Sequence, residues 1–409
     1  MRAKQRRTAK DPAIINRPFG SLALPILNSL RILQIGMHER GSGGGLDRIF
    51  WDLVDQLAVL PDLAVSPFFF RHRSTPIERR SGEFCLGSTS QFAGRRLWNL
   101  RQAVLTELRA SRSSSVVVAS HFSFYAAALL PKLSRMNHVV HFHGPWAAET
   151  AAERRLQLNV AMKRAVEGAV YSSAKAFVTL SQAFKDLLTA EYRVDAARVH
   201  VIPGAVDAQR FSPGDRRAAR LLLGWPEDTR ILFCVRRLVH RMGLENLLDA
   251  FAALAGDHSD AILVIGGTGP LRDELAAKAR EHRLSDRVLF TGFIPETNLP
   301  FAYQAADLSI VPSQSLEGFG LTALESLACG TPVLVTPVGG LPEVVNQLDP
   351  KLVLKNKDTA TITDQLSAFL GGTLTVPTSE QCREYVESNF SWATIAKRVR
   401  ALYWQVSNE

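Results

Sequence analysis

The feature that most constrains the fold of this 409-residue chain is a regular alternation between short apolar runs and longer segments of helical period. Short runs rich in Val, Ile, Leu and Phe are typical of buried strands, and their alternation with helices favours parallel sheets covered on both faces. We therefore expect an α/β protein. Strands are predicted at 31–36, 65–70, 115–119, 138–142, 176–180, 199–202, 231–235, 261–265, 287–290, 308–311 and 333–335, and the clearest helices at 46–60, 244–254, 271–283, 321–329 and 379–406.

The alternation is interrupted once, which divides the chain. Turn-forming residues without any apolar period lie between Pro203 and Gly214, and they are typical of a linker. A chain of this length is also expected to form two hydrophobic cores rather than one. We predict a loose basic tail over 1–30, a first domain over 31–205, a second domain over 206–380 and a final helix over 381–409.

Charge is distributed unevenly between these parts. Residues 1–200 hold 28 Lys and Arg against 15 Asp and Glu, a net +13, whereas residues 201–409 hold 20 against 24, a net −4. A basic first domain suits an anionic membrane surface or acceptor, and the alternative is a solvated basic face without a partner. Nucleic acid is disfavoured, because no basic run is interleaved with aromatic residues that could stack on bases.

Cysteine usage and hydropathy bear on the compartment. The four cysteines are far apart in the sequence and form no Cys-x-x-Cys pair, so we expect reduced thiols in a cytoplasmic protein. No apolar run reaches the ~18 residues that a membrane span needs. The basic start is not followed by an uninterrupted apolar segment of the kind that a signal peptide requires.

The first domain carries two candidate ligand-binding loops. Gly41–Gly45 joins a strand to a helix, where bare backbone N–H groups and the helix dipole can hold phosphate or sugar oxygens. Leu46 occupies the last required position of Gly-x-Gly-x-x-Gly, so a nicotinamide fingerprint is not supported, and a plain turn remains the alternative. His121 and His143 each follow a strand, at the edge where open α/β sheets bind ligands. We interpret His121 as structural and His143, beside Gly144, as a site candidate.

Three neighbouring strands of the second domain also end in candidate loops. Arg236 and Arg237 follow the first strand, and a guanidinium donates two parallel hydrogen bonds to phosphate oxygens. Gly266-Gly267-Thr268-Gly269 follows the next strand. Glu317-Gly318-Phe319-Gly320-Leu321 is predicted to open a helix that carries Glu325 and ends near Gly330.

Together these motifs resemble those of the retaining glycosyltransferases of family four, which have the GT-B fold of two facing Rossmann-like domains. The likeness covers nearly all of 31–409. It rests on Gly43-Gly44-Gly45-Leu46-Asp47-Arg48, His143-Gly144, Arg237-Leu238-Val239 with Gly243, Gly266 to Leu271, Ala305 to Leu308, Glu317 to Gly320 with Glu325 in a Glu-x7-Glu spacing, and Gly330 to Val333 running on to Gly339 to Glu343.

The resemblance implies roles on the donor side, in the second domain. Glu325 would bind the ribose diol of a nucleotide sugar, and Glu317 would fix the hydroxyls of the donor sugar. Arg237 would neutralise the leaving diphosphate, an electrostatic contribution of a few kcal/mol. Backbone N–H groups would assist at Gly318, Phe319, Gly320 and Leu321, and at Gly267 and Thr268.

The resemblance also implies that the first domain binds the acceptor and that the final helix crosses back to this domain. Gly44 and Gly45 would help to bind the donor, and His143 would line the sugar and acceptor side. Transfer would occur on the front face, with the departing phosphate taking the acceptor's proton and without a covalent enzyme intermediate.

One departure concerns the family pattern Arg-Leu-Val-x-x-Lys-Gly. This chain has Met242 at the lysine position, and a thioether cannot replace an ammonium. We hypothesise that Arg241 reaches the diphosphate instead. The alternative is that Arg241 points to solvent, and activity is weak or relies on Arg236.

We therefore predict a nucleotide-sugar-dependent glycosyltransferase, with a lipid-linked or polysaccharide acceptor and a cytoplasmic location that includes the membrane's inner face. No metal or other cofactor is expected, because the chain contains no Asp-x-Asp pair. Hydrolysis is disfavoured, because eight residues of continuous helix span about 12 Å, whereas glycosidase carboxyl groups lie ~5 to 9.5 Å apart. The competing hypotheses are a GT-B-fold sugar-nucleotide epimerase and an inactive nucleotide-sugar-binding protein.

Overall fold

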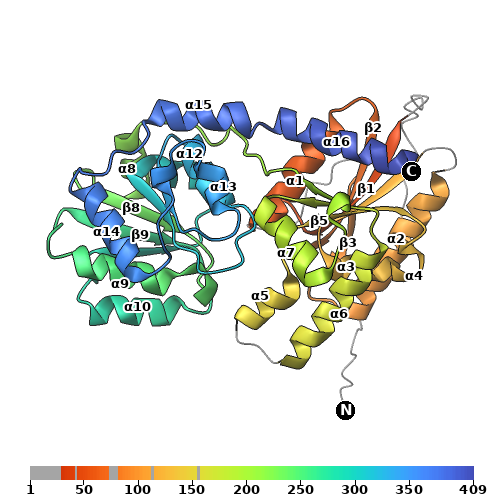
Figure 1. Ribbon diagram of the computed structural model, residues 1–409, viewed down its shortest axis with the longest axis horizontal. Coiled ribbons are helices and arrows are strands. Elements are labelled where there is room, and N and C mark those ends of the chain that lie inside the picture. Colours follow the sequence, from red (N-terminus) through yellow and green to blue (C-terminus); the bar gives the residue numbers. More distant parts are fainter. Residues whose placement is uncertain (1–28, 42–43, 73–81, 112–114, 154–156) are drawn as a thin grey trace, which may run out of the picture.

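The chain folds into two lobes, each built on a parallel sheet (Figure 1). The computed structural model describes residues 29–41, 44–72, 82–111, 115–153 and 157–409. The expected tail therefore lies outside the described residues up to position 28, and Leu30 already belongs to the first strand. The expected α/β class with parallel sheets is confirmed.

The first lobe has a seven-stranded sheet in the order β3-β2-β1-β4-β5-β6-β7. Every neighbouring pair runs parallel. Its strands are β1 (Leu30–His38), β2 (Leu63–Arg71), β3 (Phe84–Ser88), β4 (Val116–Ser120), β5 (Asn137–Phe142), β6 (Ala176–Thr179) and β7 (Val199–Val201), and its helices are α1 (Gly45–Ala58), α2 (Ala93–Ala110), α3 (Ser123–Ala126), α4 (Leu130–Leu133), α5 (Trp146–Ala152), α6 (Gln157–Ser173) and α7 (Gln182–Tyr192), with 3-10 turns η1 (Ala127–Leu129) and η2 (Ala196–Arg198).

The second lobe has a five-stranded sheet in the order β10-β9-β8-β11-β12, also parallel. Its strands are β8 (Arg230–Val235), β9 (Ala261–Gly266), β10 (Val288–Gly292), β11 (Leu308–Val311) and β12 (Val333–Val335), and its helices are α8 (Arg216–Leu223), α9 (Leu244–Leu254), α10 (Arg272–Glu281), α11 (Leu299–Ala305), α12 (Leu321–Ala328), α13 (Leu341–Val345), α14 (Thr359–Leu370) and α15 (Ser379–Asn389), with 3-10 turns η3 (His240–Met242) and η4 (Pro350–Leu352).

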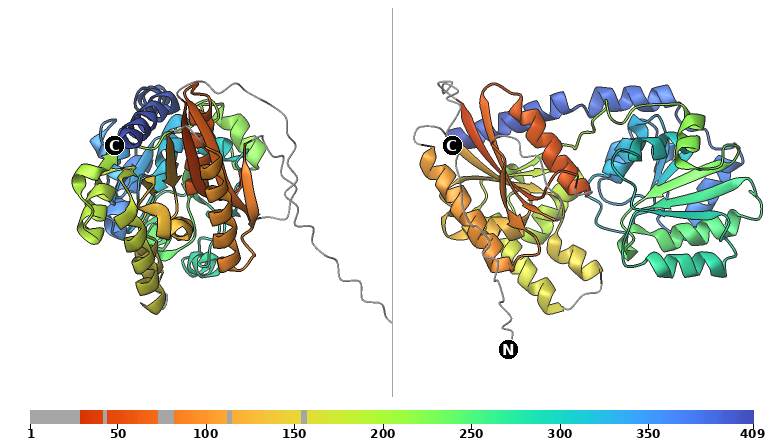
Figure 2. Two further views of the ribbon diagram at one scale, coloured as in Figure 1. Left: turned by 90° about the vertical axis from the view of Figure 1, so that its right-hand side faces the viewer. Right: turned by 180° about the vertical axis from the view of Figure 1, so that it is seen from behind.

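The last helix, α16 (Trp392–Asn408), leaves the second lobe and packs on the first (Figures 1 and 2). Its apolar side chains, among them Ile395 and Val399, share a core with Ile32 of β1 and Val117 of β4. The other face of the same sheet is covered by α2, α3 and α6, where Leu33 and Val118 are buried. The two faces alternate along each strand, as the pleat requires.

The predicted helix over 379–406 is interrupted at Phe390 and Ser391. Ser391 forms an isolated bridge with Val206, in the segment predicted as a linker. The two connections between the lobes therefore lie side by side at one point.

Two other local predictions need correction. Glu317 to Gly320 do not open a helix: α12 begins at Leu321, with Gly320 as its N-cap residue at φ 97°. Hence the 12 Å estimate for Glu317 and Glu325, which assumed a continuous helix, does not apply. An additional strand, β3, was not predicted, because this edge strand is only half-buried and contains Gly87.

Candidate active site

A buried ion pair lies where β8 and β11 end. Arg236 follows β8, and its side chain is only 6% exposed. Its Nη2 pairs with Oε2 of Glu317 and donates to Ser313 Oγ at 2.9 Å, while Nη1 donates to Thr322 Oγ1 at 3.1 Å. Ser313 Oγ donates to the same Glu317 oxygen at 2.8 Å. The guanidinium thus connects the β8 loop to the first turn of α12.

The same guanidinium contacts the residue that departs from the family pattern. Arg236 Nη2 lies 2.8 Å from Met242 Sδ, and Met242 is buried. Within the described residues, the buried Arg236 Nε has no hydrogen-bond partner. A buried cation that is incompletely paired has capacity for another anion.

Two cations predicted from the sequence, Arg237 and Arg241, pair with carboxylates of the first lobe, one on α5 and one just after it. Arg237 is 56% exposed and its Nη1 lies 3.6 Å from Glu153 Oε1. Arg241 is 10% exposed, with Nη2 3.3 Å from Glu149 Oε1 and Nη1 donating to the carbonyl of Leu316 at 3.2 Å. Arg241 therefore does not point to solvent, which corrects the alternative stated above. Burial raises the pKa of Glu149, an effect that Arg241 opposes.

The second glutamate of the motif also meets the first lobe. Glu325 on α12 is 1% exposed, and its Oε1 lies 3.2 Å from Nη2 of Arg48 on α1. Tyr303 donates to its Oε2 at 2.9 Å. Desolvation raises the pKa of Glu325, and Arg48 lowers it in opposition. A carboxylate with both oxygens engaged, one of them across the lobes, is thus held at their junction.

The predicted glycine positions differ in how closely they are packed. A Cβ at Gly267, where φ is 119°, would lie 1.9 Å from the carbonyl oxygen of Arg236, so glycine lets the β9 loop support the β8 loop. Thr268 is exposed and its carbonyl accepts from the N–H of Leu238 at 3.0 Å. Gly45 lies opposite Leu321, whose side chain would contact an added Cβ at 3.9 Å; Gly44 is the N-cap residue of α1.

The backbone ahead of α12 presents unused donors. Within the described residues, the N–H groups of Gly318, Phe319 and Gly320 donate to no protein acceptor. The Phe319 ring is buried in the core of the second lobe, so only its backbone is available to a ligand. Across the lobes, Ser181 Oγ donates to the carbonyl of Gly318 at 2.6 Å, and Glu343 accepts from the N–H groups of Gln182 and Ala183 at 2.8 and 3.0 Å.

His143 lies at the carboxyl end of β5 within a group of stacked imidazoles. Its Nε2 is 2.9 Å from Nδ1 of His121, and the rings of His121 and His141 stack with centroids 4.3 Å apart. Burial lowers the pKa of His143 to about 4 and that of His141 to about 3. Both imidazoles are therefore neutral at pH 7.

Sequence reasoning missed several members of this arrangement. Arg48 was read only as part of the glycine motif, and Tyr303, Gln34 and Tyr403 were not considered. The available signal was a polar residue inside an apolar pattern, such as Gln34 between Leu33 and Ile35.

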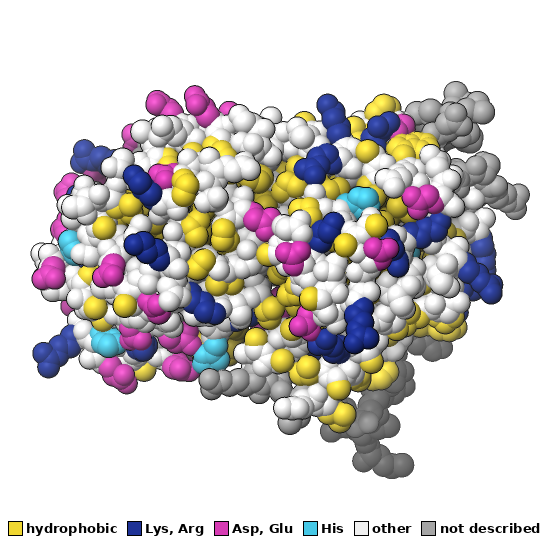
Figure 3. All heavy atoms as spheres, in the orientation of Figure 1, with side chains coloured by type: hydrophobic (Ala, Val, Ile, Leu, Met, Phe, Trp, Pro, Cys, Tyr) yellow, Lys and Arg dark blue, Asp and Glu magenta, His cyan; other side chains and the backbone are white. Residues whose placement is uncertain are grey.

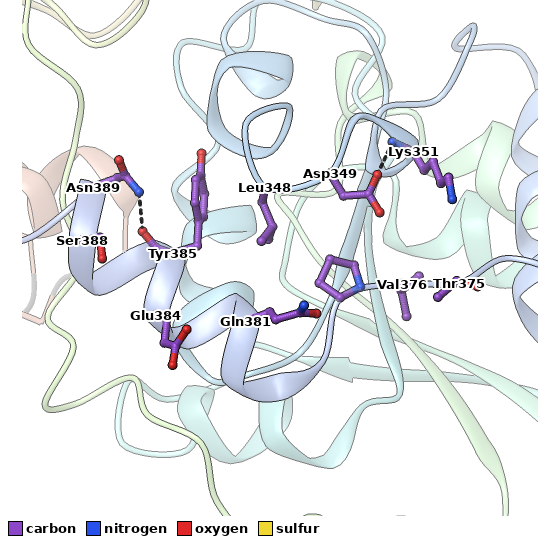
Figure 4. A pocket seen from close by; sticks show the side chains of 11 residues that line it. Leu348, Asp349, Lys351, Thr375, Val376, Gln381, Glu384, Tyr385, Ser388 and Asn389 are labelled. Atoms are coloured by element: carbon purple, nitrogen blue, oxygen red, sulfur yellow. Dashed lines mark hydrogen bonds between the residues drawn. The ribbon is translucent and has the colours of Figure 1, made fainter.

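A hollow on the second lobe lies apart from these residues (Figure 4). It is formed by α15 and two segments, 348–351 and 375–377, and none of the residues lining it is a candidate site residue. Among the described residues, no group of three His, Cys, Asp or Glu side chains is arranged to hold a metal ion.

Comparison with known proteins divides the chain at the same place as the lobes. Residues 43–210 match the family described as "Glycosyltransferase Family 4", and residues 215–389 match "Glycosyl transferases group 1". A D-inositol 3-phosphate glycosyltransferase of Actinosynnema mirum is 34% identical over 255 residues, 58% of this chain and 59% of the relative. That of Mycobacterium tuberculosis H37Ra is 43% identical over 155 residues, 37% and 32% of the two chains. The matched regions thus span from a third to about three fifths of these relatives.

Solved structures show the same fold over most of the chain. Sucrose-phosphate synthase of Thermosynechococcus elongatus superposes with a TM-score of 0.75 at 23% identity, covering 92% of this chain and 99% of that one. HepE of Anabaena, solved in complex with UDP-glucose, gives 0.72 at 17% identity, covering 92% and 99%. With both lobes matched by glycosyltransferase families and the fold shared throughout, this chain belongs to the GT-B glycosyltransferases of family four.

Proposed function

We propose that the chain transfers a sugar from a nucleoside diphosphate sugar to a hydroxyl acceptor, with retention of configuration at the anomeric carbon. The observation that carries this proposal is the position of Glu325, buried in the second lobe yet 3.2 Å from Arg48 of the first. A ligand that binds Glu325 lies between the lobes, and Arg237 and Arg241 also reach across the lobes, to Glu153 and Glu149. Arg48 must then exchange Glu325 for the ligand or move with it.

Donor binding follows from this arrangement. Glu325 accepts hydrogen bonds from the ribose diol, and Glu317 accepts from hydroxyls of the transferred sugar. The free N–H groups of Gly318, Phe319 and Gly320 donate to donor oxygens beside the N-terminus of α12, where that helix's dipole favours negative charge. Leu321, Gly267, Thr268, Gly44 and Gly45 shape the walls on either side.

The diphosphate needs cations, and the second lobe offers three. Arg236 pairs with Glu317, and Arg237 and Arg241 pair with Glu153 and Glu149. Within the described residues, the buried Nε atoms of Arg236 and Arg241 have no partner. We assign to Arg236 the role of the lysine that Met242 replaces, because its guanidinium lies against the Met242 sulfur. Arg237 and Arg241 neutralise the remaining charge after releasing Glu153 and Glu149.

The transfer step is a front-face substitution. The bond between the anomeric carbon and the diphosphate oxygen breaks, and the leaving group takes the electron pair. The acceptor oxygen bonds to the same face of that carbon, and its proton passes to the departing phosphate oxygen. Positive charge from Arg236 and Arg237 stabilises the leaving group in the transition state. No covalent enzyme intermediate and no metal ion is part of the proposal.

The acceptor is proposed to be lipid-linked or a polysaccharide intermediate, presented at an anionic membrane surface. Support comes from α2 of the first lobe, whose exposed stripe combines Arg95, Trp98, Gln102 and Arg109. Phe92, just before this helix, is 82% exposed, and Trp98 is 62% exposed. Aromatic and basic side chains on one helical face suit the interface of an anionic bilayer. Among the described residues, no helix has the length and hydropathy of a membrane span.

The charge pattern is visible on the surface. In the view of Figure 3, basic side chains are spread over the first lobe at the right, and acidic ones are frequent on the second lobe at the left.

Co-sedimentation with phosphatidylglycerol vesicles tests whether α2 binds an anionic membrane. The double variant Phe92→Ser with Trp98→Ser should abolish binding. The matched control is Leu158→Ser, an exposed apolar residue of α6. Wild-type indifference to anionic lipid would refute membrane attachment.

The decisive test of function is a nucleotide-sugar screen by thermal shift, because a ligand that binds only the native state raises its apparent stability. UDP and UDP-glucose come first, since HepE was solved with both. Transfer of labelled sugar to a membrane lipid extract should follow for the donor that stabilises the protein. Conversion of donor without any acceptor would indicate an epimerase, and binding without transfer would indicate an inactive binding protein.

A further inference from the structure

A chain of hydrogen bonds connects the C-terminal helix to His143. Tyr403 of α16 is fully buried, and its hydroxyl lies 3.0 Å from Nε2 of Gln34 on β1. Gln34 Oε1 lies 2.8 Å from Nε2 of His121, and His121 Nδ1 lies 2.9 Å from Nε2 of His143. Tyr403 is also 2.7 Å from Nε2 of His141. Four side chains from distant parts of the sequence thus form one line that ends at the candidate site.

The orientation of the Gln34 amide determines which atom carries the proton in each hydrogen bond along this line. Its carbonyl oxygen can only accept, so His121 must donate from Nε2. A neutral imidazole carries one N–H, which leaves Nδ1 of His121 bare and able only to accept. His143 must therefore donate from its own Nε2, and its Nδ1 is bare as well. At the other end, Tyr403 accepts from Gln34 and donates to His141.

Ring stacking keeps the line from rearranging. The His121 ring stacks on His141 and on His143, with interplanar angles of 11° and 20°, and Phe50 closes its edge. His121 is 2% exposed and Gln34 is fully buried. Rotation of the His121 ring or of the Gln34 amide would break a hydrogen bond at a position that water does not reach. The group left unpaired would then carry its full desolvation cost.

We propose that Tyr403, Gln34 and His121 are positioning residues that hold His143 in the Nε2–H tautomer, so that its Nδ1 lone pair accepts a hydrogen bond from a substrate hydroxyl. Within the described residues, this buried Nδ1 has no partner. An acceptor there suits a sugar hydroxyl and disfavours a phosphate oxygen, which needs a donor. The final helix thus contributes to the chemistry of a site to which it contributes no substrate contact.

The tautomer is a property of the free protein, whereas the use of the lone pair rests on the proposed transfer reaction. The first experiment therefore needs no substrate. Two-bond ¹H–¹⁵N correlation spectra of histidine-labelled protein resolve protonated from bare ring nitrogens, and His143→Gln assigns the His143 signals among the ten histidines. We expect a single population with Nε2 protonated and Nδ1 bare. A protonated Nδ1 in the wild-type protein would overturn the proposal.

Two variants test which residues fix the direction of the hydrogen bonds between Tyr403 and His143. Tyr403→Phe leaves the Gln34 amide free to turn over, so a second population with protonated Nδ1 on His143 is expected. Gln34→Glu places a carboxylate against His121, which favours an imidazolium with protons on both ring nitrogens. His121 Nδ1 then donates to Nε2 of His143, so the His143 proton should move to Nδ1. The matched control is Leu402→Ala, beside Tyr403 in the same core, which should lower the melting temperature without changing the tautomer. An unchanged spectrum in Tyr403→Phe would remove Tyr403 from the line.

Activity then tests the use of the lone pair. With the donor found by screening, Tyr403→Phe should lower kcat/KM about two- to tenfold, the range of one neutral hydrogen bond partly lost. Leu402→Ala should leave kcat/KM unchanged despite its lower stability. If Tyr403→Phe changes the His143 tautomer as expected but leaves kcat/KM unchanged, Tyr403 positions His143 and the Nδ1 lone pair does not contribute to the reaction. If no donor is turned over by the wild-type protein, the proposed function fails independently of the spectra.

Discussion

The two sheet ends that face each other across the lobes are built from opposite chemistry. The second lobe presents charged groups, Arg236 with Glu317 and Glu325, each held by a partner of opposite charge. Arg236 and Glu325 are buried, and Glu317 is partly buried. The first lobe presents imidazoles whose burial keeps them neutral. Cations stabilise a leaving diphosphate, whereas neutral acceptors recognise hydroxyl groups without attracting phosphate. Arg48 and Glu149 also bring charge to the junction from helices of the first lobe, so the contrast concerns the residues at the sheet ends: a cation in the second lobe and neutral imidazoles in the first.

The largest effect is expected at Arg236, which tests whether charge resides in the second lobe. Arg236→Ala should reduce kcat/KM about 100- to 1000-fold, as removal of a single oxyanion donor does, and it leaves Glu317 without its cation. Arg236→Ala combined with Met242→Lys returns an ammonium to the lysine position and should recover a substantial part of the activity. Steady-state kinetics of the two single variants and the double variant measure the coupling. A double variant no better than Arg236→Ala would refute the exchange of roles.

A smaller effect, confined to donor affinity, is expected at Glu325. Glu325→Gln removes a charged acceptor and should raise the dissociation constant for the nucleotide about 10- to 100-fold, as loss of a hydrogen bond to a charged group does. Isothermal titration with the nucleotide alone measures it. Glu343→Gln is the matched control, because Glu343 also joins the lobes through backbone N–H groups of α7. Equal losses in both variants would show that Glu325 acts by holding the lobes together.

Arg241 should matter less than Arg236, because Arg241 lies against Glu149 of the first lobe, whereas Arg236 lies against Met242 at the lysine position. We expect Arg241→Ala to lower kcat/KM by about tenfold at most, roughly the net value of one hydrogen bond. The comparison is with Arg236→Ala under the same conditions. A loss as large as that of Arg236→Ala would restore the sequence-based hypothesis that Arg241 compensates for Met242.

How far the sequence leads depends on whether a feature is local. The helix α9 and the strands β11 and β12 lie where the apolar period and glycine or proline boundaries predict them. Glu317 and Glu325 were found because they belong to a contiguous motif. The edge strand β3 was missed because a half-buried strand with a glycine has a weak apolar pattern.

The remaining site residues could not be predicted, because they are brought together only by packing. Gln34 and Tyr403 are 369 positions apart, and each is a single polar residue in an apolar stripe. Which of the two adjacent arginines, Arg236 or Arg237, turns inward depends on how the β8 loop lies against Gly267. These placements follow from tertiary contacts, and no local pattern encodes them.

The neutrality of the first lobe should appear in its response to acid. Burial lowers the pKa of His138 to about 3, against an ordinary value of 6.5. Below pH 6.5 the unfolded chain binds a proton that the native state refuses, so stability present above this pH is lost as the pH falls. The loss is about 1 kcal/mol per pH unit for each such histidine. Urea unfolding at pH 7.5, 6 and 5 should show a shallower decline for His138→Asn, which cannot titrate, even if its absolute stability is lower.

Asp52, on α1 where the lobes meet, should respond in the opposite sense and with the smallest effect. Burial, followed by the nearby Asp207, raises its pKa from 3.8 to about 7. Between these values the native state binds a proton that the unfolded chain does not, so this group's contribution to stability declines as the pH rises. Asp52→Asn should therefore raise the melting temperature at pH 8 by a few degrees at most and change it little at pH 5, where the carboxyl is already neutral. Asp55→Asn is the control, because it removes an ion pair with Arg40 and should destabilise at both pH values. An equal effect of Asp52→Asn at pH 5 and 8 would mean that this carboxyl stays ionised, and that the junction between the lobes is wetter than its packing implies.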